Sequence, residues 1–218
     1  MTEIATILCI AAPADSATAL GAYWMEKYAN YALGKGHQVI YQKTPTLPVL
    51  YEALLNFNPQ LVVANGHGGY KSLRVGENIL IGTKGYDTAT HRNIRAGDED
   101  YFTGRITLLL TCNAGTELVK ALSKHGATAV MGYRKPYVFL VDEDKQPQDD
   151  DVSKPFFEAL FQPAIQLADG ATFQQSIDAT RASFKYYINL VQDKDTRKFL
   201  DFNLQNLTAI GNPDAKLT

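Results

Sequence analysis

Short apolar runs of strand length recur along this chain, and they constrain its fold more than any other feature of the sequence. Amphipathic stretches separate them. Uninterrupted apolar runs suit strands that are buried on both faces, and such strands occur in parallel sheets covered by helices. The pattern therefore predicts an α/β fold with a mostly parallel sheet and helices on both faces. The runs occupy residues 4–12, 38–41, 61–64, 106–110 and 128–131.

The stretches between the runs have the composition of helices. The first, residues 16–33, has Asp15 or Ser16 available as its N-cap and ends before two glycines. Residues 68–103 break the pattern with Gly, Lys, Asp and Thr, and they predict a long loop or small hairpin. Long loops in compact domains usually have a functional role. Further helices are predicted at residues 48–57, 114–124, 152–169 and 172–191, and a late strand at residues 206–210.

Length and composition indicate one compact domain. The chain has 218 residues, of which 45% are hydrophobic, and this is enough to bury a full core. No repeat, low-complexity segment or linker marks a second domain, so residues 1–218 are predicted to fold as a single domain.

Charge and hydropathy bear on the partners and the location of the protein. The formal net charge of -2 gives no basic field that would collect nucleic acid or an anionic membrane. No run approaches the roughly 20 apolar residues that a membrane span requires. The residues that precede the first run include Glu3 but no Lys or Arg, which favours a first strand over a signal peptide. We therefore expect a cytoplasmic protein that binds neither nucleic acid nor membrane.

Two strand ends carry the residues with the clearest chemistry. The run at residues 61–64 continues into Asn-Gly-His67-Gly68, and the run at residues 106–110 continues into Thr-Cys112. Because ligands gather at the carboxyl ends of parallel strands, we expect His67 and Cys112 to lie on the same edge of the sheet. A thiol beside an imidazole forms a nucleophile and its base. His67 and Cys112 are therefore the predicted catalytic pair.

The backbone around this pair predicts an oxyanion-binding site. Gly68 lets its backbone N–H approach a substrate closely, and the chain that turns after Cys112 directs further N–H groups to the same place. A tetrahedral oxyanion could be held by the amides of Gly68 and Cys112. The positive end of the helix expected from residue 114 would also favour the thiolate.

These two strand ends resemble those of the caspase-like (clan CD) cysteine peptidases. Caspases, legumains, gingipains, separases and CHAT-domain proteases share an apolar strand ending in His-Gly, here His67-Gly68, and a second ending in a small residue and Cys, here Thr111-Cys112. The chain is most similar to the gingipain and CHAT branches. The resemblance implies a three-layer caspase-haemoglobinase-like sandwich. It also implies an endopeptidase in which Cys112 attacks a peptide carbonyl and an acyl-enzyme forms.

Some features depart from relatives in this group. The caspase signature Gln-Ala-Cys is absent, and Leu110 stands where metacaspase-like enzymes carry Asp. Signatures around the cysteine do not transfer between families, so the catalytic pair stands while caspase-like specificity does not. The alternative function is a catalytically silent caspase-like binding or assembly module. Retention of both His67 and Cys112 favours the enzyme, whose partners would be a protein or peptide substrate and possible partner subunits or a regulator.

The resemblance implies that the loop after the first strand helps to form the primary specificity pocket. That loop carries Asp15 and contains no Arg or Lys, and Asp142 and Asp144 in the acidic stretch 142–151 could add negative charge. A carboxylate there favours Lys or Arg before the scissile bond. Two alternatives stay open: Asp15 only caps the following helix, or the pair Arg134-Lys135 lines the opposite wall.

No cofactor or metal is predicted, because no close ligand pair such as Cys-x-x-Cys is present. The acidic stretch 142–151 is interpreted as a solvated loop, with calcium binding or substrate recognition as alternatives. Cys9 lies within the first strand and is expected to be a core residue. The remaining histidines, His37, His91 and His125, have no predicted partner.

Overall fold

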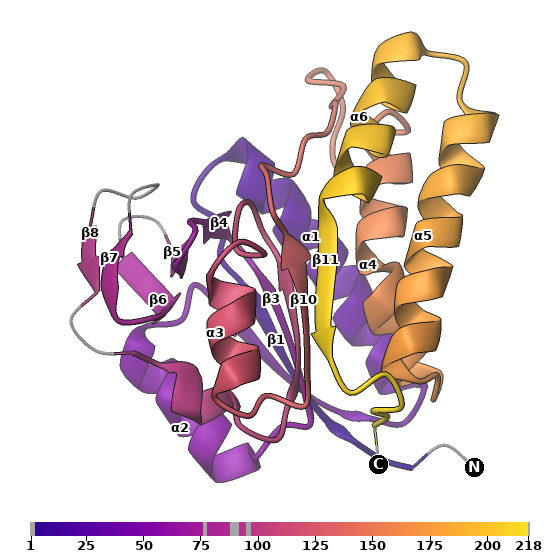
Figure 1. The fold of residues 1–218 in the computed structure, drawn as a ribbon. Helices are drawn as coiled ribbons and strands as arrows, with labels where there is room; N and C mark the ends of the chain where they lie inside the picture. The colour runs from indigo at the N-terminus through magenta and orange to yellow at the C-terminus, as the bar shows by residue number, and fades with distance from the viewer. Residues whose placement is uncertain (1–2, 76–77, 88–91, 95–96, 218) are drawn as a thin grey trace.

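The computed structural model describes residues 3–75, 78–87, 92–94 and 97–217, and centres on a six-stranded sheet (Figure 1). The strand order is β11-β10-β9-β3-β1-β2. Neighbouring strands are parallel except for the edge strand β11, which pairs antiparallel with β10. The predicted mostly parallel sheet is confirmed. Its strands are β1 (Thr6–Ala11), β2 (Gln38–Lys43), β3 (Leu61–Asn65), β9 (Ile106–Leu110), β10 (Ala129–Tyr133) and β11 (Leu207–Gly211).

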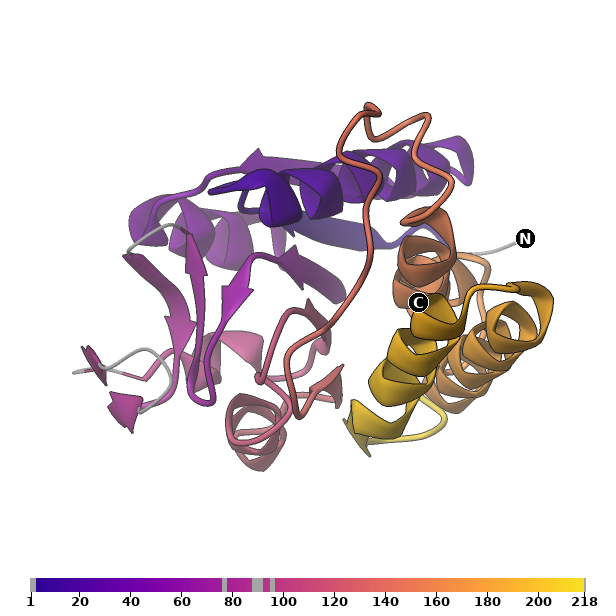
Figure 2. The same cartoon turned by 90° about the horizontal axis from the view of Figure 1, so that it is seen from above.

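Helices cover both faces of this sheet, which makes three layers (Figures 1 and 2). One face packs against α1 (Ser16–Gly34), α4 (Lys154–Ala168), α5 (Phe173–Leu190) and α6 (Lys194–Asn206). The other packs against α2 (Leu47–Phe57) and α3 (Leu118–Lys124). Strand β1 shows why both faces must be apolar: Ile7 and Cys9 belong to the first core, whereas Leu8 and Ile10 belong to the second. Cys9 is the buried core residue that was expected.

Helix α3 begins at Leu118, so the prediction of a helix from residue 114 is wrong at its start. The reason is Gly115, whose N–H donates to the carbonyl of Tyr133 at 2.9 Å. A Cβ at Gly115 would lie 2.5 Å from Thr208 Cγ2, so this segment packs against the sheet instead of coiling. The positive end of α3 is therefore not beside Cys112, and it does not supply the expected stabilisation of the thiolate.

The segment at residues 68–103, predicted as a long loop or small hairpin, contains several short strands. Strand β4 (His67–Gly68) follows β3 directly and starts an antiparallel sheet with β5 (Ser72–Val75) and β6 (Asn78–Gly82). The segment also contains a second antiparallel pair, β7 (Gly85–Asp87) and β8 (Arg92–Ile94), and a short 3-10 helix (Glu99–Phe102). His67 is the first residue of β4 and so lies where the central sheet passes into this segment.

Helix α6 is absent from the sequence prediction because its surface is mostly polar. Its N-cap is Asp193, whose carboxylate accepts from the backbone N–H of Thr196 at 2.6 Å. Only one residue in three or four faces the core, as Thr196, Leu200 and Asn203 show. The Asn203 side chain accepts from Val138 N at 3.0 Å and donates to Val138 O at 2.6 Å, which fixes the chain after β10.

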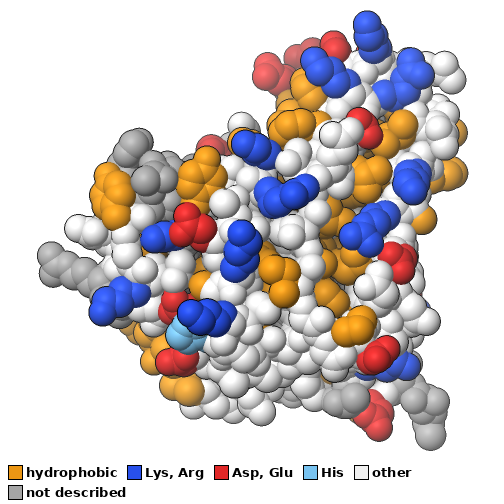
Figure 3. Space-filling view, in the orientation of Figure 1, with side chains coloured by type: hydrophobic (Ala, Val, Ile, Leu, Met, Phe, Trp, Pro, Cys, Tyr) orange, Lys and Arg blue, Asp and Glu red, His pale blue; other side chains and the backbone are white. Residues whose placement is uncertain are grey.

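Charged side chains are mixed over the face in Figure 3, where Lys and Arg lie among Asp and Glu with no extended area of one sign. Within the described ranges, no helix combines the length and the hydropathy needed to cross a membrane.

Candidate active site

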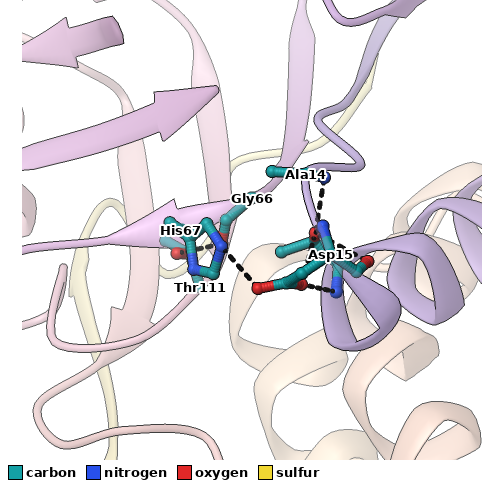
Figure 4. A network of polar contacts seen from close by, with 6 residues as sticks. Ala14, Asp15, Gly66, His67 and Thr111 are labelled. Carbon is teal, nitrogen blue, oxygen red and sulfur yellow. Dashed lines mark hydrogen bonds and ion pairs between the residues drawn. The ribbon is translucent and has the colours of Figure 1, made fainter. Parts of the chain in front are cut away.

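Two side chains tie the ends of β3 and β9 together. These strands are parallel neighbours, with Asn65 opposite Leu110. The Asn65 amide donates to the carbonyl of Leu110 at 3.0 Å. The Thr111 hydroxyl donates to the carbonyl of Gly66 at 2.7 Å, as Figure 4 shows. Both side chains are buried. The sequence did not predict that Asn65 and Thr111 connect the two strand ends. Their position directly after two apolar runs could have indicated it.

Gly68 lies against the backbone of Cys112. A Cβ on Gly68 would lie 1.8 Å from the Cys112 carbonyl oxygen and 2.5 Å from Thr111 Oγ1, so only glycine fits there. The fold thus brings together the two residues predicted to bind an oxyanion. Among the described residues, no backbone carbonyl accepts from the N–H of Cys112, which interacts with the thiol of the same residue.

The Cys112 thiol is half-buried at the edge of the core. Burial raises the pKa of this thiol, and a hydrogen bond from Tyr137 N to Sγ at 3.3 Å offsets the increase only in part. The raised pKa favours the neutral thiol, which needs a base to become a nucleophile. Both His67 and Cys112 are described, and no hydrogen bond joins them, as is common for catalytic pairs before a substrate tightens the geometry.

The His67 imidazole pairs with Asp15, which sequence reasoning did not foresee. His67 Nε2 lies 2.9 Å from Asp15 Oδ2 (Figure 4), and the two side chains are 37% and 48% exposed. A carboxylate accepts a hydrogen bond, so it favours the tautomer that carries its proton on Nε2. Nδ1 then keeps a lone pair, and it can act as the base.

Asp15 is also the N-cap of α1. Its Oδ1 accepts from the backbone N–H of Thr18 at 2.9 Å, and the Thr18 hydroxyl reaches back to close a capping box. The hydrogen bond from Thr18 lowers the pKa of Asp15, with a smaller contribution from His67. The capping interpretation of Asp15 is therefore observed. Both carboxylate oxygens of Asp15 therefore have partners within the chain. A contact of Asp15 with substrate stays a prediction.

A cavity of about 740 Å³ is lined by Tyr137, whose N–H donates to the Cys112 thiol, and it has acidic groups on its lining. Its walls come from the first turn of α1, the segment from Tyr137 to Val141, and the acidic stretch. Asp142 and Glu143 line it, together with Lys145, whose Nζ lies 3.5 Å from Asp142. Asp144 is not on the lining, although its N–H donates to Asp142 Oδ1 at 3.3 Å.

The other histidines have structural partners. His37 is buried, and its ring bonds to Ala5 N at 3.2 Å and to Ala168 O at 2.8 Å. His125 Nδ1 lies 2.9 Å from Asp100. His91 lies outside the described residues. In the part of the chain that is described, no group of three or more His, Cys, Asp or Glu side chains could hold a metal ion.

Comparison with known proteins gives a result for structure but none for sequence. No protein-family model and no curated protein matches the chain. A solved structure, the complex of the pro- and mature domains of RgpB from Porphyromonas gingivalis, is similar with a TM-score of 0.60 and 12% identity. The chain has a caspase-like fold. The predicted three-layer architecture and the likeness to gingipains in fold are confirmed.

The alignment with RgpB covers very different shares of the two chains. The alignment covers 98% of this chain but 48% of the RgpB chain, so the protein spans about half the length of that structure. At 12% identity, the similarity concerns the fold alone. The likeness therefore says nothing of the activity or the specificity of this chain.

Proposed function

We propose that this protein is a cysteine endopeptidase in which Cys112 is the nucleophile, His67 the general acid and base, and Asp15 the group that orients His67. The observation that carries the proposal is the contact of 2.9 Å between His67 Nε2 and the Asp15 carboxylate, at the strand end that contacts Cys112. A base held by a third group beside a nucleophile is the arrangement that activates a thiol. The likeness in fold to a cysteine peptidase supports it.

The geometry suggests the following sequence of steps. Nδ1 of His67 takes the Cys112 proton while sulfur bonds to the carbonyl carbon, and the oxyanion is stabilised by the amides of Cys112 and Gly68. Nδ1–H then gives its proton to the leaving nitrogen as the C–N bond breaks. Water, deprotonated by Nδ1, hydrolyses the thioester and releases the thiol. Burial raises the pKa of Cys112, which favours proton transfer to His67 during attack over a preformed thiolate.

We infer a basic residue before the scissile bond from the cavity beside the thiol. Tyr137 donates its N–H to Cys112 Sγ and also lines this cavity, so the cavity opens next to the nucleophile. Asp142 and Glu143 would attract an ammonium or guanidinium group, while the apolar lining would pack against its aliphatic stem. Asp15 pairs with His67 and does not line this cavity, so the proposed recognition of the basic side chain rests on Asp142 and Glu143.

A peptide-library scan tests the proposal, with the Cys112→Ala protein as its control. We expect cleavage after Lys or Arg that is lost in Cys112→Ala, and a mass increase on Cys112 with a peptidyl alkylating probe. A preference for Asp or Asn before the cut would contradict the basic pocket. Failure of both cleavage and labelling would reject the enzyme.

One observation favours the second candidate, a catalytically silent binding module. The Cys112 thiol contacts Tyr137 N, and no hydrogen bond joins it to His67. Labelling separates the candidates: reaction of Cys112 that falls in His67→Ala supports the enzyme, whereas an unreactive Cys112 supports the module.

A further inference from the structure

Strand β5 places a cation beside the proposed catalytic histidine. In the antiparallel pair of β4 and β5, Arg74 is the residue directly opposite His67. Opposite residues of an antiparallel pair extend from the same face, with Cβ atoms roughly 4.5–5.5 Å apart. The strands are also held close together here, since a Cβ on Gly66 would lie 2.7 Å from the Arg74 carbonyl oxygen. The side chains of Arg74 and His67 are therefore neighbours.

The guanidinium of Arg74 makes no hydrogen bond or ion pair with any residue in the described ranges. The residue is partly buried, and its Nε is buried without a partner. The other arginines whose side chains are described each donate to an acceptor within the chain, as Arg105 does to Leu54 O at 2.9 Å. Those arginines are Arg105, Arg134, Arg181 and Arg197. Partial burial of an unpaired cation costs free energy, which a bound anion would recover.

The position of Arg74 assigns it to one side of the scissile bond. In the proposed function, the acidic cavity that Tyr137 lines holds the residue before the cut, which belongs to the acyl part of the substrate. His67 donates its proton to the leaving amine, so it must face the residue that follows the cut. Arg74 shares the face of His67, and its charge is opposite to that of the cavity.

We propose that Arg74 binds a carboxylate in the leaving segment of the substrate, either an Asp or Glu side chain directly after the cut or a free C-terminal carboxylate. A guanidinium recognises a carboxylate through two parallel hydrogen bonds, which suits this chemistry better than a lone ammonium would. Together with the acidic cavity, this predicts a preference for a basic residue before the cut and an anionic group after it. The inference rests on the proposed peptidase function.

The test uses amidated peptides with Lys before the cut and Glu, Gln or Lys after it, with wild type, Arg74→Gln and Arg74→Glu. We expect wild type to prefer Glu over Gln by about tenfold in kcat/KM, as for one charge-assisted hydrogen bond. The ratio should fall to about one in Arg74→Gln, and Arg74→Glu should prefer Lys. Arg181→Gln, an exposed arginine on α5, is the matched control and should keep the wild-type ratio.

A second arm distinguishes the two sources of the carboxylate. Peptides in which Gln after the cut is the last residue are compared with a free and an amidated C-terminus. A preference that appears only with the free terminus assigns Arg74 to the α-carboxylate, and a preference for Glu assigns it to the side chain. Equal rates for all peptides with wild type, or a preference that survives Arg74→Gln, would overturn the inference.

Binding measurements keep this test separate from the test of peptidase activity. Fluorescence anisotropy with the Cys112→Ala protein gives the affinity for each peptide without turnover. If wild type cleaves nothing, the peptidase proposal fails, while tighter binding of the Glu peptide that depends on Arg74 would still support carboxylate recognition. Equal affinities for all peptides would reject it.

Discussion

The two ends of the central sheet each carry a histidine, and their surroundings differ. At the amino end, His37 precedes β2 and is buried, with one ring nitrogen accepting from Ala5 N and the other donating to Ala168 O. At the carboxyl end, His67 is 37% exposed, with Nε2 on Asp15 and no hydrogen bond at Nδ1 to a described residue. One histidine completes the hydrogen bonds of the fold, whereas the other keeps a free lone pair. The difference indicates that stability is concentrated at the first end and reactivity at the second.

The largest expected effect comes from removing the proposed catalytic pair. Cys112→Ala and His67→Ala should each lower kcat/KM on a cleaved peptide by on the order of 10⁴ or more, and the double variant should lose no more than either single variant. Melting temperatures should change little, because neither side chain fills the core. Peptide kinetics and thermal unfolding measure both. Wild-type activity in either single variant would contradict the assignment.

Gly68→Ala should also lower activity strongly, by about 10²–10³-fold, which is the effect of losing one oxyanion donor. The added methyl group would meet the Cys112 carbonyl, so the strand end must shift. Gly34→Ala is the control, because nothing lies within 4 Å of a Cβ at that position. Peptide kinetics of the two variants should differ. If Gly68→Ala cleaved as fast as Gly34→Ala, the close approach would have no catalytic role.

The opposite pattern is expected at the amino end of the sheet. His37→Phe leaves Ala5 N–H and Ala168 O unsatisfied in the interior, which should lower the free energy of unfolding by about 2–4 kcal/mol. His125→Ala is the matched control and should cost about 0.5 kcal/mol or less, since its pair with Asp100 is exposed. Urea unfolding measures both. At a temperature where His37→Phe remains folded, its kcat/KM should match wild type, and a large loss there would refute the division between the two ends.

The regular part of the fold follows from the sequence because strands and helices leave periodic patterns. The bounds of β3 and β9 were predicted to within one residue, and with them the placement of His67 and Cys112 at the same edge of the sheet. Helix α6 was not predicted, because its few buried residues, such as Leu200, are surrounded in the sequence by charged and polar residues and leave no apolar pattern. Patterns of this kind report burial, and α6 buries little.

The contacts that complete the site could not be predicted in the same way. The pairing of Asp15 with His67 depends on how the loop after β1 turns into α1, and no periodicity encodes that turn. Arg74 lies in a segment predicted only as loop or hairpin, so its register opposite His67 had no sequence signal. Polar residues at strand ends mark where a site lies, while loop geometry decides which of them meet.

Substitutions of Asp15 can separate its two roles, as the N-cap of α1 and as the partner of His67. Asn is as good an N-cap as Asp, so Asp15→Asn should keep the stability of α1 while removing the charge beside His67. We expect a loss of about tenfold to a hundredfold in kcat/KM with little change in unfolding. Asp15→Ala should lose a similar amount of activity and also about 1 kcal/mol of stability. Equal activity of wild type and Asp15→Asn would show that the carboxylate serves only as a cap.

The pH dependence of Cys112 alkylation is the smallest of these effects. Burial raises the pKa of the thiol, so the thiolate fraction at neutral pH should be lower than for an ordinary cysteine, whose pKa is about 8.5. The rate with iodoacetamide should therefore be slow at pH 7 and should keep rising above pH 8.5. Cys9 is fully buried and should stay unlabelled in the folded protein, which makes Cys112→Ala the blank. A rate that is already at its plateau at pH 7 would mean that His67 holds Cys112 as a thiolate before substrate binds, and the proposed role of His67 as a base during attack would have to be replaced by a preformed ion pair.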